Sequence, residues 1–190
     1  MLFPGDLGDK KDRVISGITV HLSIRIRGIV LVKIEIRKAQ KEDASLILKF
    51  VKELAIYEKA EHEVVATEAD IEKSIFGVAS TVYALICSID GRPAGFAIYF
   101  FNYSTWLGKK GMFLEDLYVS PEFRGAGAGK ALLKYLAKLA INEDCGRFEW
   151  NVLDWNRSAI DFYESIGATP LSEWVGYRLS DQSLTNFAIE

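Results

Sequence analysis

The chain has 190 residues, of which 49% are hydrophobic and 26% are charged, and its formal net charge is −3. This length suits one domain with a sizeable core, and the composition excludes a disordered or fibrous protein. The mildly acidic balance argues against a nucleic-acid partner.

The two cysteines and the short apolar runs indicate a reducing environment outside a membrane. Cys87 and Cys145 form neither a disulfide framework nor a metal-ligand pattern, so we expect no metal site and a reducing, cytoplasmic environment. The longest apolar run near the start, Ile29–Val32, is far shorter than the roughly 20 residues that a membrane-spanning helix needs. We therefore expect no membrane partner.

The N-terminal region changes character part-way. Residues 1–17 carry a proline, glycines and a charge cluster, which favours a mobile terminus. Apolar and polar residues then alternate through Ile18–Ile26 and again through Val32–Arg37, and Gly28 between them offers a turn. The two runs therefore predict a hairpin of half-buried strands.

The alternative for this region is an upstream extension whose alternation is accidental. Whether or not the hairpin forms, we expect residues 1–31 to be an N-terminal extension. This extension is either mobile or adds an edge strand to the sheet. A single domain is expected over residues 32–190, because no internal repeat or low-complexity linker divides it.

In the middle of the chain, apolar residues recur with helical spacing in some segments and at every second position in others, which indicates helices and strands. Capping residues and an Asp-Gly turn mark some of the boundaries. The predicted elements are a helix over Lys41–Lys59, a capped helix from Thr67 to Gly77, strands over Thr81–Ile89 and Pro93–Tyr103, and a polar loop over Asn102–Lys110.

A strand, a glycine-rich turn and a helix follow one another in the centre of the chain. The strand, Met112–Val119, stops before Pro121, and the small residues of Arg124–Lys130 lead into a helix with apolar spacing from Ala131. The first amides of such a helix are unpaired, and with the helix dipole they form an anion site that suits a pyrophosphate. A tight turn without a ligand is the alternative.

Two better-known phosphate loops fit this stretch poorly. A P-loop needs Ser or Thr after its lysine, and Lys130 is followed by Ala131. The dinucleotide fingerprint needs a small residue at the position that Lys130 occupies.

The C-terminal part predicts shorter elements. They are a strand over Arg147–Leu153, a helix over Arg157–Ser165 that stops at Gly167, a strand over Tyr177–Leu179, and an unassigned tail over Asp181–Glu190. Strands and helices in this order predict an α+β fold with a mixed sheet.

Two motifs in the second half carry a resemblance to a known family. The first is arginine-x-x-glycine-x-glycine after a strand, as Arg124, Gly127 and Gly129. The second lies one strand later, and its matching positions are Asn156, Phe162, Tyr163, Gly167 and Ala168. Together they resemble the signatures of the GNAT superfamily of N-acetyltransferases, over roughly residues 34–179. The resemblance implies the GNAT fold, in which helices flank a mixed, mostly antiparallel sheet.

Within the superfamily, the chain resembles the spermidine/spermine N-acetyltransferase group and is similar to its thialysine N-epsilon-acetyltransferase branch. The N-terminal extension has no counterpart there. The segments that carry the resemblance are Glu53–Glu58, Tyr99-Phe100, Tyr103–Gly108, Leu114–Asp116 and Val152–Asn156.

The resemblance implies acetyl-CoA as the acetyl donor, with its pyrophosphate on the loop amides. The candidate coenzyme-binding residues are Arg124, Gly125, Gly127, Gly129, Lys130 and Asn156. The resemblance also assigns the backbone amides of Leu117 and Val119 to the thioester oxygen, provided that the next strand splays away and frees them.

The resemblance further assigns two catalytic roles. A primary ammonium has a pKa of about 10.4 and must lose a proton before it attacks a thioester, and Glu115 matches the position of the base. Tyr163 matches the acid that protonates the departing thiolate. The alternatives are a solvated strand carboxylate and a packed helix tyrosine. Because neither cysteine has a setting that lowers a thiol pKa, we expect direct attack by the amine.

Acidic, hydroxyl and aromatic residues are the candidates for binding the amine. Glu58 and Asp116 are expected to hold ammonium groups, and Ser104, Thr105 and Trp106 to contact an amino-acid end and the alkyl chain. The expected partners are a small diamine or diamino acid and, from the resemblance, a second copy in a homodimer. Two alternatives stay open: a non-catalytic module that binds acyl-CoA, and an enzyme that acts on a protein or antibiotic amine.

Overall fold

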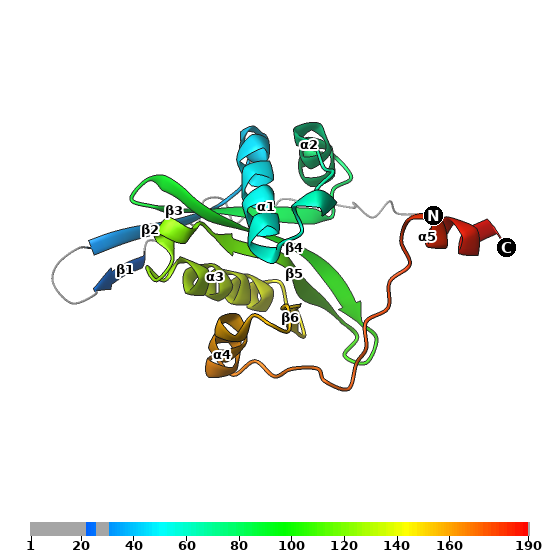
Figure 1. The fold of residues 1–190 in the computed structure, drawn as a ribbon. Coiled ribbons are helices and arrows are strands. Elements are labelled where there is room, and N and C mark those ends of the chain that lie inside the picture. The colour runs from blue at the N-terminus through cyan, green and yellow to red at the C-terminus, as the bar shows by residue number, and fades with distance from the viewer. Residues whose placement is uncertain (1–21, 26–30, 190) are drawn as a thin grey trace, which may run out of the picture. The chain divides into compact units, whose positions relative to one another are not determined.

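The computed structural model describes residues 22–25 and 31–189, which fall into two compact units: the described residues up to Asn151, and those from Val152 to Ile189 (Figure 1). The first unit contains β1 (Leu22–Arg25), β2 (Leu31–Lys38), α1 (Ala44–Glu58), α2 (Glu68–Phe76), β3 (Val82–Ile89), β4 (Arg92–Ser104), β5 (Lys109–Val119), α3 (Ala128–Asn142) and β6 (Phe148–Trp150). The second contains α4 (Arg157–Ser165) and α5 (Asp181–Ile189).

The strands form one six-stranded sheet whose spatial order is their chain order, β1 to β6. Neighbours are antiparallel except for β5 and β6, which run parallel. In Figure 1, α1 and α2 lie on one side of this sheet and α3 lies on the other. The arrangement confirms the predicted α+β fold, with a mixed, mostly antiparallel sheet flanked by helices.

The N-terminal runs pair as a hairpin would. Leu22 of β1 lies opposite Ile34 of β2, and Arg25 lies opposite Leu31. The described part of the first run, β1, is therefore a strand at the edge of the sheet beside β2. The predicted mobile terminus over residues 1–17, the start of the first run and the Gly28 turn lie outside the described residues.

The hairpin between β3 and β4 turns where the sequence predicts it. Asp90 and Gly91 have φ angles of 49° and 77°, and a two-residue hairpin turn of type I′ requires positive φ at both positions. The next hairpin differs from the prediction, because β4 and β5 extend into the predicted loop Asn102–Lys110 as far as the pair Ser104 and Lys109. Their ladder satisfies the backbone, so polar side chains there do not end the strands.

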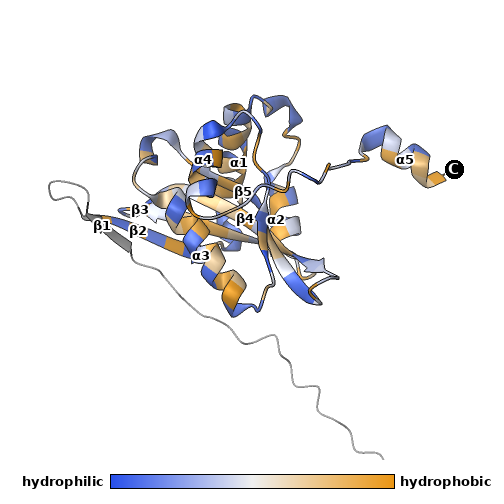
Figure 2. Cartoon of the chain, turned by 90° about the horizontal axis from the view of Figure 1, so that it is seen from below, coloured by the Kyte–Doolittle hydropathy of each residue, from blue (hydrophilic) through white to orange (hydrophobic). Residues whose placement is uncertain are grey.

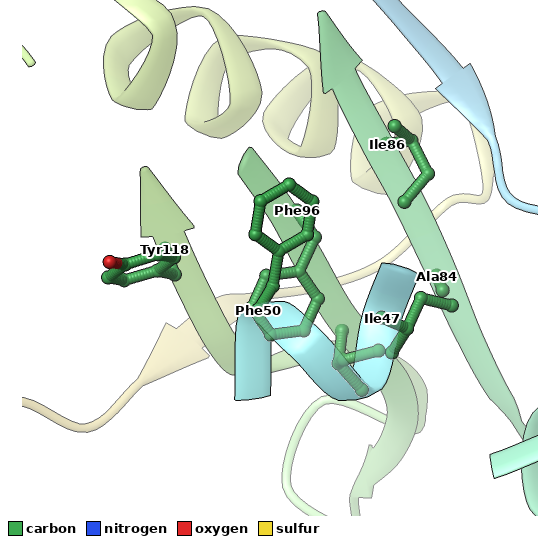
Figure 3. Close-up of a cluster of buried hydrophobic side chains, with 7 residues drawn as sticks. Ile47, Phe50, Ala84, Ile86, Phe96 and Tyr118 are labelled. Carbon is green, nitrogen blue, oxygen red and sulfur yellow. The ribbon is translucent and has the colours of Figure 1, made fainter. Parts of the chain in front are cut away.

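The side of the sheet beneath α1 holds an aromatic core. Phe50 of α1 stacks on Phe96 of β4, with ring centroids 5.6 Å apart, and its ring centroid lies 6.3 Å from that of Tyr118 (Figure 3). Phe50 and Phe96 are at most 1% exposed, and burial of each such side chain stabilises the fold by about 1.5–3 kcal/mol. This packing fixes α1 against β5.

Polar side chains stabilise the starts of both helices on this side, by an ion pair at α1 and by a capping box at α2. The two Arg37 nitrogens donate to the Asp43 carboxylate at 2.6 and 2.8 Å, which links β2 to the start of α1 and lowers the pKa of Asp43. At α2, Thr67 Oγ1 accepts from the Asp70 amide at 3.3 Å, and Asp70 accepts from the Thr67 amide at 2.9 Å. The second pair is the predicted capping box.

α3 begins earlier than predicted, at Ala128 instead of Ala131. Gly127 caps the helix in the left-handed region, with φ of 89°, and so allows the helix to start directly after it. The buried side chains of α3 include Leu132, Leu133 and Leu136, and Figure 2 shows that hydrophilic and hydrophobic residues alternate along the helix. Such a pattern is typical of a helix with one face against a sheet.

The C-terminal part agrees with the predicted elements at α4 and differs from them elsewhere. β6 has only three residues, instead of the predicted Arg147–Leu153, whereas α4 has the predicted bounds. The predicted strand Tyr177–Leu179 is wrong, since this segment is neither helix nor strand. Three alternating residues cannot form a strand without a partner ladder, which the period does not reveal. The unassigned tail forms α5.

In the part of the chain that the structure describes, no helix has the length and apolar character required to cross a bilayer.

Candidate active site

The glycine loop presents free amides at the start of α3. Gly125 and Gly127 have φ angles of 79° and 89°, which only glycine adopts readily. The first hydrogen bond of α3 runs from the Ala131 amide to the Gly127 carbonyl at 2.9 Å, so the amides of Ala128–Lys130 precede the helical ladder. They point out of the helix at the positive end of its dipole.

The space beside this loop is open at two of its glycines. A Cβ added at Gly125 would meet no atom within 4 Å, and one added at Gly129 would approach no closer than 3.8 Å, to Leu117. The protein leaves open the volume that these side chains would fill. A phosphate could therefore approach the backbone without displacing protein atoms.

β5 has an unpaired edge next to the loop. β6 pairs only with Met112–Leu114, and β5 continues to Val119. The Ser120 amide donates to the Ala94 carbonyl of β4 at 2.9 Å. Because amide directions alternate along a strand, the amides of Leu117 and Val119 point away from β4. On this edge, opposite β4, no strand among the described residues pairs with β5 beyond Leu114.

The centre of β5 contains a β-bulge. Leu114 lies opposite Tyr99 and Asp116 lies opposite Ile98, so Glu115 is the extra residue. Directly opposite residues share a face of the sheet, and Ile98 packs in the cluster beneath α1. The bulge therefore places Asp116 on the α1 face, at the position that regular alternation would have given to Glu115.

The carboxyl group of Asp116 on β5 lies near two others, those of Glu115 on β5 and Glu58 on α1. Burial, followed by the charges of Glu115 and Glu58, raises the pKa of Asp116 to about 6. Burial also raises the pKa of Glu58, the last residue of α1. Lys59 then ends the helix in the left-handed region, with φ of 61°. A cationic group bound here would relieve the repulsion between the carboxylates.

A second polar network joins the end of β5 to α1, and the sequence did not predict it. Ser120 Oγ donates to Glu53 Oε2 at 2.8 Å. Arg124 Nε donates to the Val119 carbonyl at 3.0 Å, and its guanidinium lies 4.7 Å from the centroid of the Tyr57 ring. Glu53 and Tyr57 both belong to the α1 segment that carries the resemblance, which was the available signal.

The remaining substrate candidates lie at the tip of the β4–β5 hairpin. Ser104 is 7% exposed, and its Oγ accepts from the Leu107 amide at 3.3 Å, so it stabilises the turn. Thr105 is exposed, and Trp106 is 89% exposed. Ser104 lies six positions along β4 from Ile98, the partner of Asp116, which is about 20 Å along a strand. One chain therefore does not bring the tip and the carboxylates together.

Asn156 and Tyr163 belong to the second unit. Asn156 Oδ1 accepts from the Ala159 amide at 3.3 Å and so caps α4. Tyr163 is half-buried in α4, with its ring centroid 5.8 Å from that of Phe162. Gly167, with φ of 89°, follows the helix. The coenzyme role of Asn156 and the acid role of Tyr163 stay predictions.

Comparison with known families identifies this architecture. The model of the Acetyltransferase (GNAT) family matches residues 48–168, a range that contains β5, the glycine loop and α4. The chain belongs to the GNAT family. This GNAT protein is an N-acetyltransferase, in agreement with the resemblance of its motifs. Its described residues contain no group of three or more His, Cys, Asp or Glu side chains arranged to hold a metal ion.

Individual relatives span most of the GNAT chain. It is 34% identical to thialysine N-epsilon-acetyltransferase of Mus musculus, over 80% of this chain and 96% of the relative. It is 31% identical to L-ornithine N5-acetyltransferase NATA1 of Arabidopsis thaliana, over 78% of this chain and 85% of the relative. Among solved structures, the V. cholerae integron cassette protein VCH_CASS6 has a TM-score of 0.71 and 29% identity, over 83% of this chain and 98% of that one.

Proposed function

We propose that this GNAT enzyme transfers the acetyl group of acetyl-CoA to a primary amine of a small diamino acid or diamine in the cytoplasm. One observation carries the proposal. The end of β5, Glu115–Val119, combines a carboxylate pair with outward-facing amides at an unpaired edge, and it leads directly into the glycine loop.

The donor side of the site consists mainly of backbone groups. Acetyl-CoA supplies the activated acetyl group, and the first-turn amides Ala128–Lys130 bind its pyrophosphate at the positive end of the helix dipole. The amides of Leu117 and Val119 donate to the acetyl oxygen as negative charge develops on it. Asn156 is a further coenzyme contact.

The acceptor side consists of carboxylates. Asp116 and Glu58 pair with an ammonium group of the substrate, whose charge offsets their mutual repulsion. Glu115 is exposed beside them and takes the proton from the reacting amine through water. A general base must be accessible to water and close to the bound amine, and a bulge residue on an open strand edge meets both needs.

Tyr163 completes the reaction as the acid. The departing thiolate has a conjugate-acid pKa of about 8.5, and a phenol with a pKa of about 10 can donate to it. The amine attacks the thioester directly, without a covalent enzyme intermediate, because burial raises the pKa of both cysteine thiols and so makes them poor nucleophiles.

The substrate class follows from the carboxylates and the relatives. Thialysine and ornithine, which the names of two relatives specify, are diamino acids with an amino group at each end. Such a molecule offers one amine for reaction and one ammonium for the carboxylates. Ser104, Thr105 and Trp106 are too far along the ladder to reach the carboxylates of their own chain. We therefore place them beside the site of the second copy in a homodimer.

An amine panel with acetyl-CoA, followed by thiol release, tests the proposed function. Diamino acids should give the fastest release, followed by polyamines. Binding of coenzyme A without thiol release for any amine would favour a non-catalytic module. Release only with protein or aminoglycoside amines would move the enzyme to another substrate class within the family.

A further inference from the structure

The side chain of Arg124 turns back onto its own protein. Its Nε donates to the Val119 carbonyl at 3.0 Å. Its guanidinium carbon lies 4.7 Å from the ring centroid of Tyr57 and 5.6 Å from that of Tyr118. A cation is attracted by the face of each ring, so these contacts hold the side chain against α1 and β5.

The contact with Val119 connects Arg124 to the donor side of the site. The N–H and C=O of one strand residue point to the same side of an antiparallel strand. The carbonyl that Arg124 binds and the amide assigned to the acetyl oxygen therefore share one edge. By bonding to this carbonyl, Arg124 orients that edge and fixes the first residue of the glycine loop.

The two tyrosines connect the same cation to the acceptor side. Tyr57 precedes Glu58 on α1, and Tyr118 follows Asp116 by two residues on β5. Tyr118 and Asp116 share the face beneath α1, because their partners Phe96 and Ile98 both pack in that cluster. One guanidinium thus contacts both elements that carry the carboxylates, as well as the strand end before the loop.

We propose that Arg124 is a positioning residue, which fixes the coenzyme loop against α1 and β5 and does not contact the pyrophosphate itself. The inference rests on the proposed function, since it takes the loop to hold coenzyme A. It assigns the anion contacts to the backbone amides of the first turn of α3. The positive charge of Arg124 then matters only through its position between the tyrosines.

The experiment is calorimetry with coenzyme A on Arg124→Ala, Arg124→Lys, Tyr57→Leu and the double variant Arg124→Ala with Tyr57→Leu. Loss of the contacts should weaken binding by about three- to tenfold in each single variant. The double variant should bind coenzyme A no more weakly than the single variant of lower affinity, because both changes remove the same contact between Arg124 and Tyr57. Lysine should fail to restore affinity, since it keeps the charge but lacks the Nε donor and the planar face.

Salt dependence separates positioning from direct binding. A side chain that contacts the pyrophosphate contributes an ion pair, which salt screens, so its loss would flatten the fall of affinity with salt. We expect the same salt dependence in the wild type and in Arg124→Ala. Arg92→Ala is the matched control. The guanidinium of Arg92 lies 4.8 Å from the ring centroid of Phe123, the residue that precedes Arg124. The Arg92→Ala variant should bind coenzyme A with the affinity of the wild type.

Two outcomes would overturn different statements. Wild-type affinity in Arg124→Lys, together with a flattened salt dependence in Arg124→Ala, would make Arg124 a phosphate ligand and overturn the inference alone. A wild-type chain that does not bind coenzyme A would overturn the proposed function, and this inference with it. If circular dichroism shows that Tyr57→Leu does not fold, Arg124→Lys, at an exposed side chain, still distinguishes positioning from phosphate binding. Reduced affinity for coenzyme A in this variant supports positioning, and wild-type affinity contradicts it.

Discussion

Asp116 lies directly opposite Ile98 and shares its face of the sheet, so a carboxyl group borders the apolar cluster beneath α1. Its surroundings favour the neutral form and account for its pKa of about 6. The same position makes this group costly to ionise and well placed to pair with a cation.

We predict that Asp116→Asn stabilises the fold at pH 7 and changes it little at pH 4. The folded-state pKa lies above the unfolded value, so the folded state binds more protons between the two, and stability falls as pH rises toward 6. The amide removes this effect, with a gain of about 1–3 kcal/mol at pH 7. Urea unfolding at both pH values measures it. Glu122→Gln, at an exposed carboxyl, is the control, and equal gains at both pH values would contradict the assignment.

The glycine loop should tolerate no negative side chain. Gly127→Asp places a carboxylate where the pyrophosphate is proposed to bind, and we expect loss of detectable coenzyme A binding in a folded protein. Gly91→Asp is a matched control, because Gly91 also has a positive φ but lies in the β3–β4 turn. Calorimetry compares the two. Unchanged affinity in folded Gly127→Asp would rule out the loop as the binding site.

Tyr163→Phe should lower kcat by about 10²–10⁴-fold while coenzyme A affinity changes little, because only a hydroxyl that acts late in the reaction is removed. Tyr177→Phe, at a tyrosine that is 94% exposed in the same unit, serves as the control. Steady-state kinetics and calorimetry are both needed. Turnover above about a tenth of the wild type would leave Tyr163 as a packing residue.

The substrate assignment predicts a higher kcat/KM for thialysine or ornithine than for spermidine. A site that hydrogen-bonds a polar group rejects an analogue that leaves its donors unpaired. Ser104→Ala with Thr105→Ala should narrow this preference, and Glu58→Gln should raise KM for every diamine. Glu61→Gln, at an exposed carboxyl beyond α1, is the control. Faster turnover of spermidine by the wild type would overturn the assignment and leave the acetyltransferase activity intact.

The N-terminal extension should be dispensable for chemistry. A chain that starts at Val32 loses β1 and exposes the edge of β2, but it keeps every proposed site residue. We expect it to fold and turn over, with a lower melting temperature than a chain that starts at Leu22. Thermal circular dichroism and the thiol-release assay test this. Loss of both folding and turnover would make the extension part of the core.

Local chemistry made much of the fold predictable. Thr67 and Asp70 specify a helix start within four residues, and Asp90-Gly91 specifies a hairpin in two, because each depends on contacts between near neighbours. Tyr177–Leu179 shows the limit of such signals. Its alternation matches a strand, but strand formation depends on a partner ladder that local periodicity does not encode.

The sequence identified candidate residues for the site but did not predict their contacts with one another. Arg124 stood out by its motif, yet its contact with Tyr57 joins positions 67 residues apart that nothing in the local pattern connects. The bulge in β5 was also not predictable from the local pattern, because it depends on pairing with another strand. One extra residue, Glu115, changes the facing of Asp116, and its presence depends on the register with β4.

Glu115 could be removed from β5 without turning any other side chain to the opposite face. Leu114 would still meet Tyr99, and Asp116 would still meet Ile98, in a strand of regular alternation. The residue proposed as the base is thus an extra residue of the strand, exposed and outside both core layers. The position of the proposed base and the core positions of this strand are separate, so a substitution at Glu115 can change the chemistry without repacking either layer.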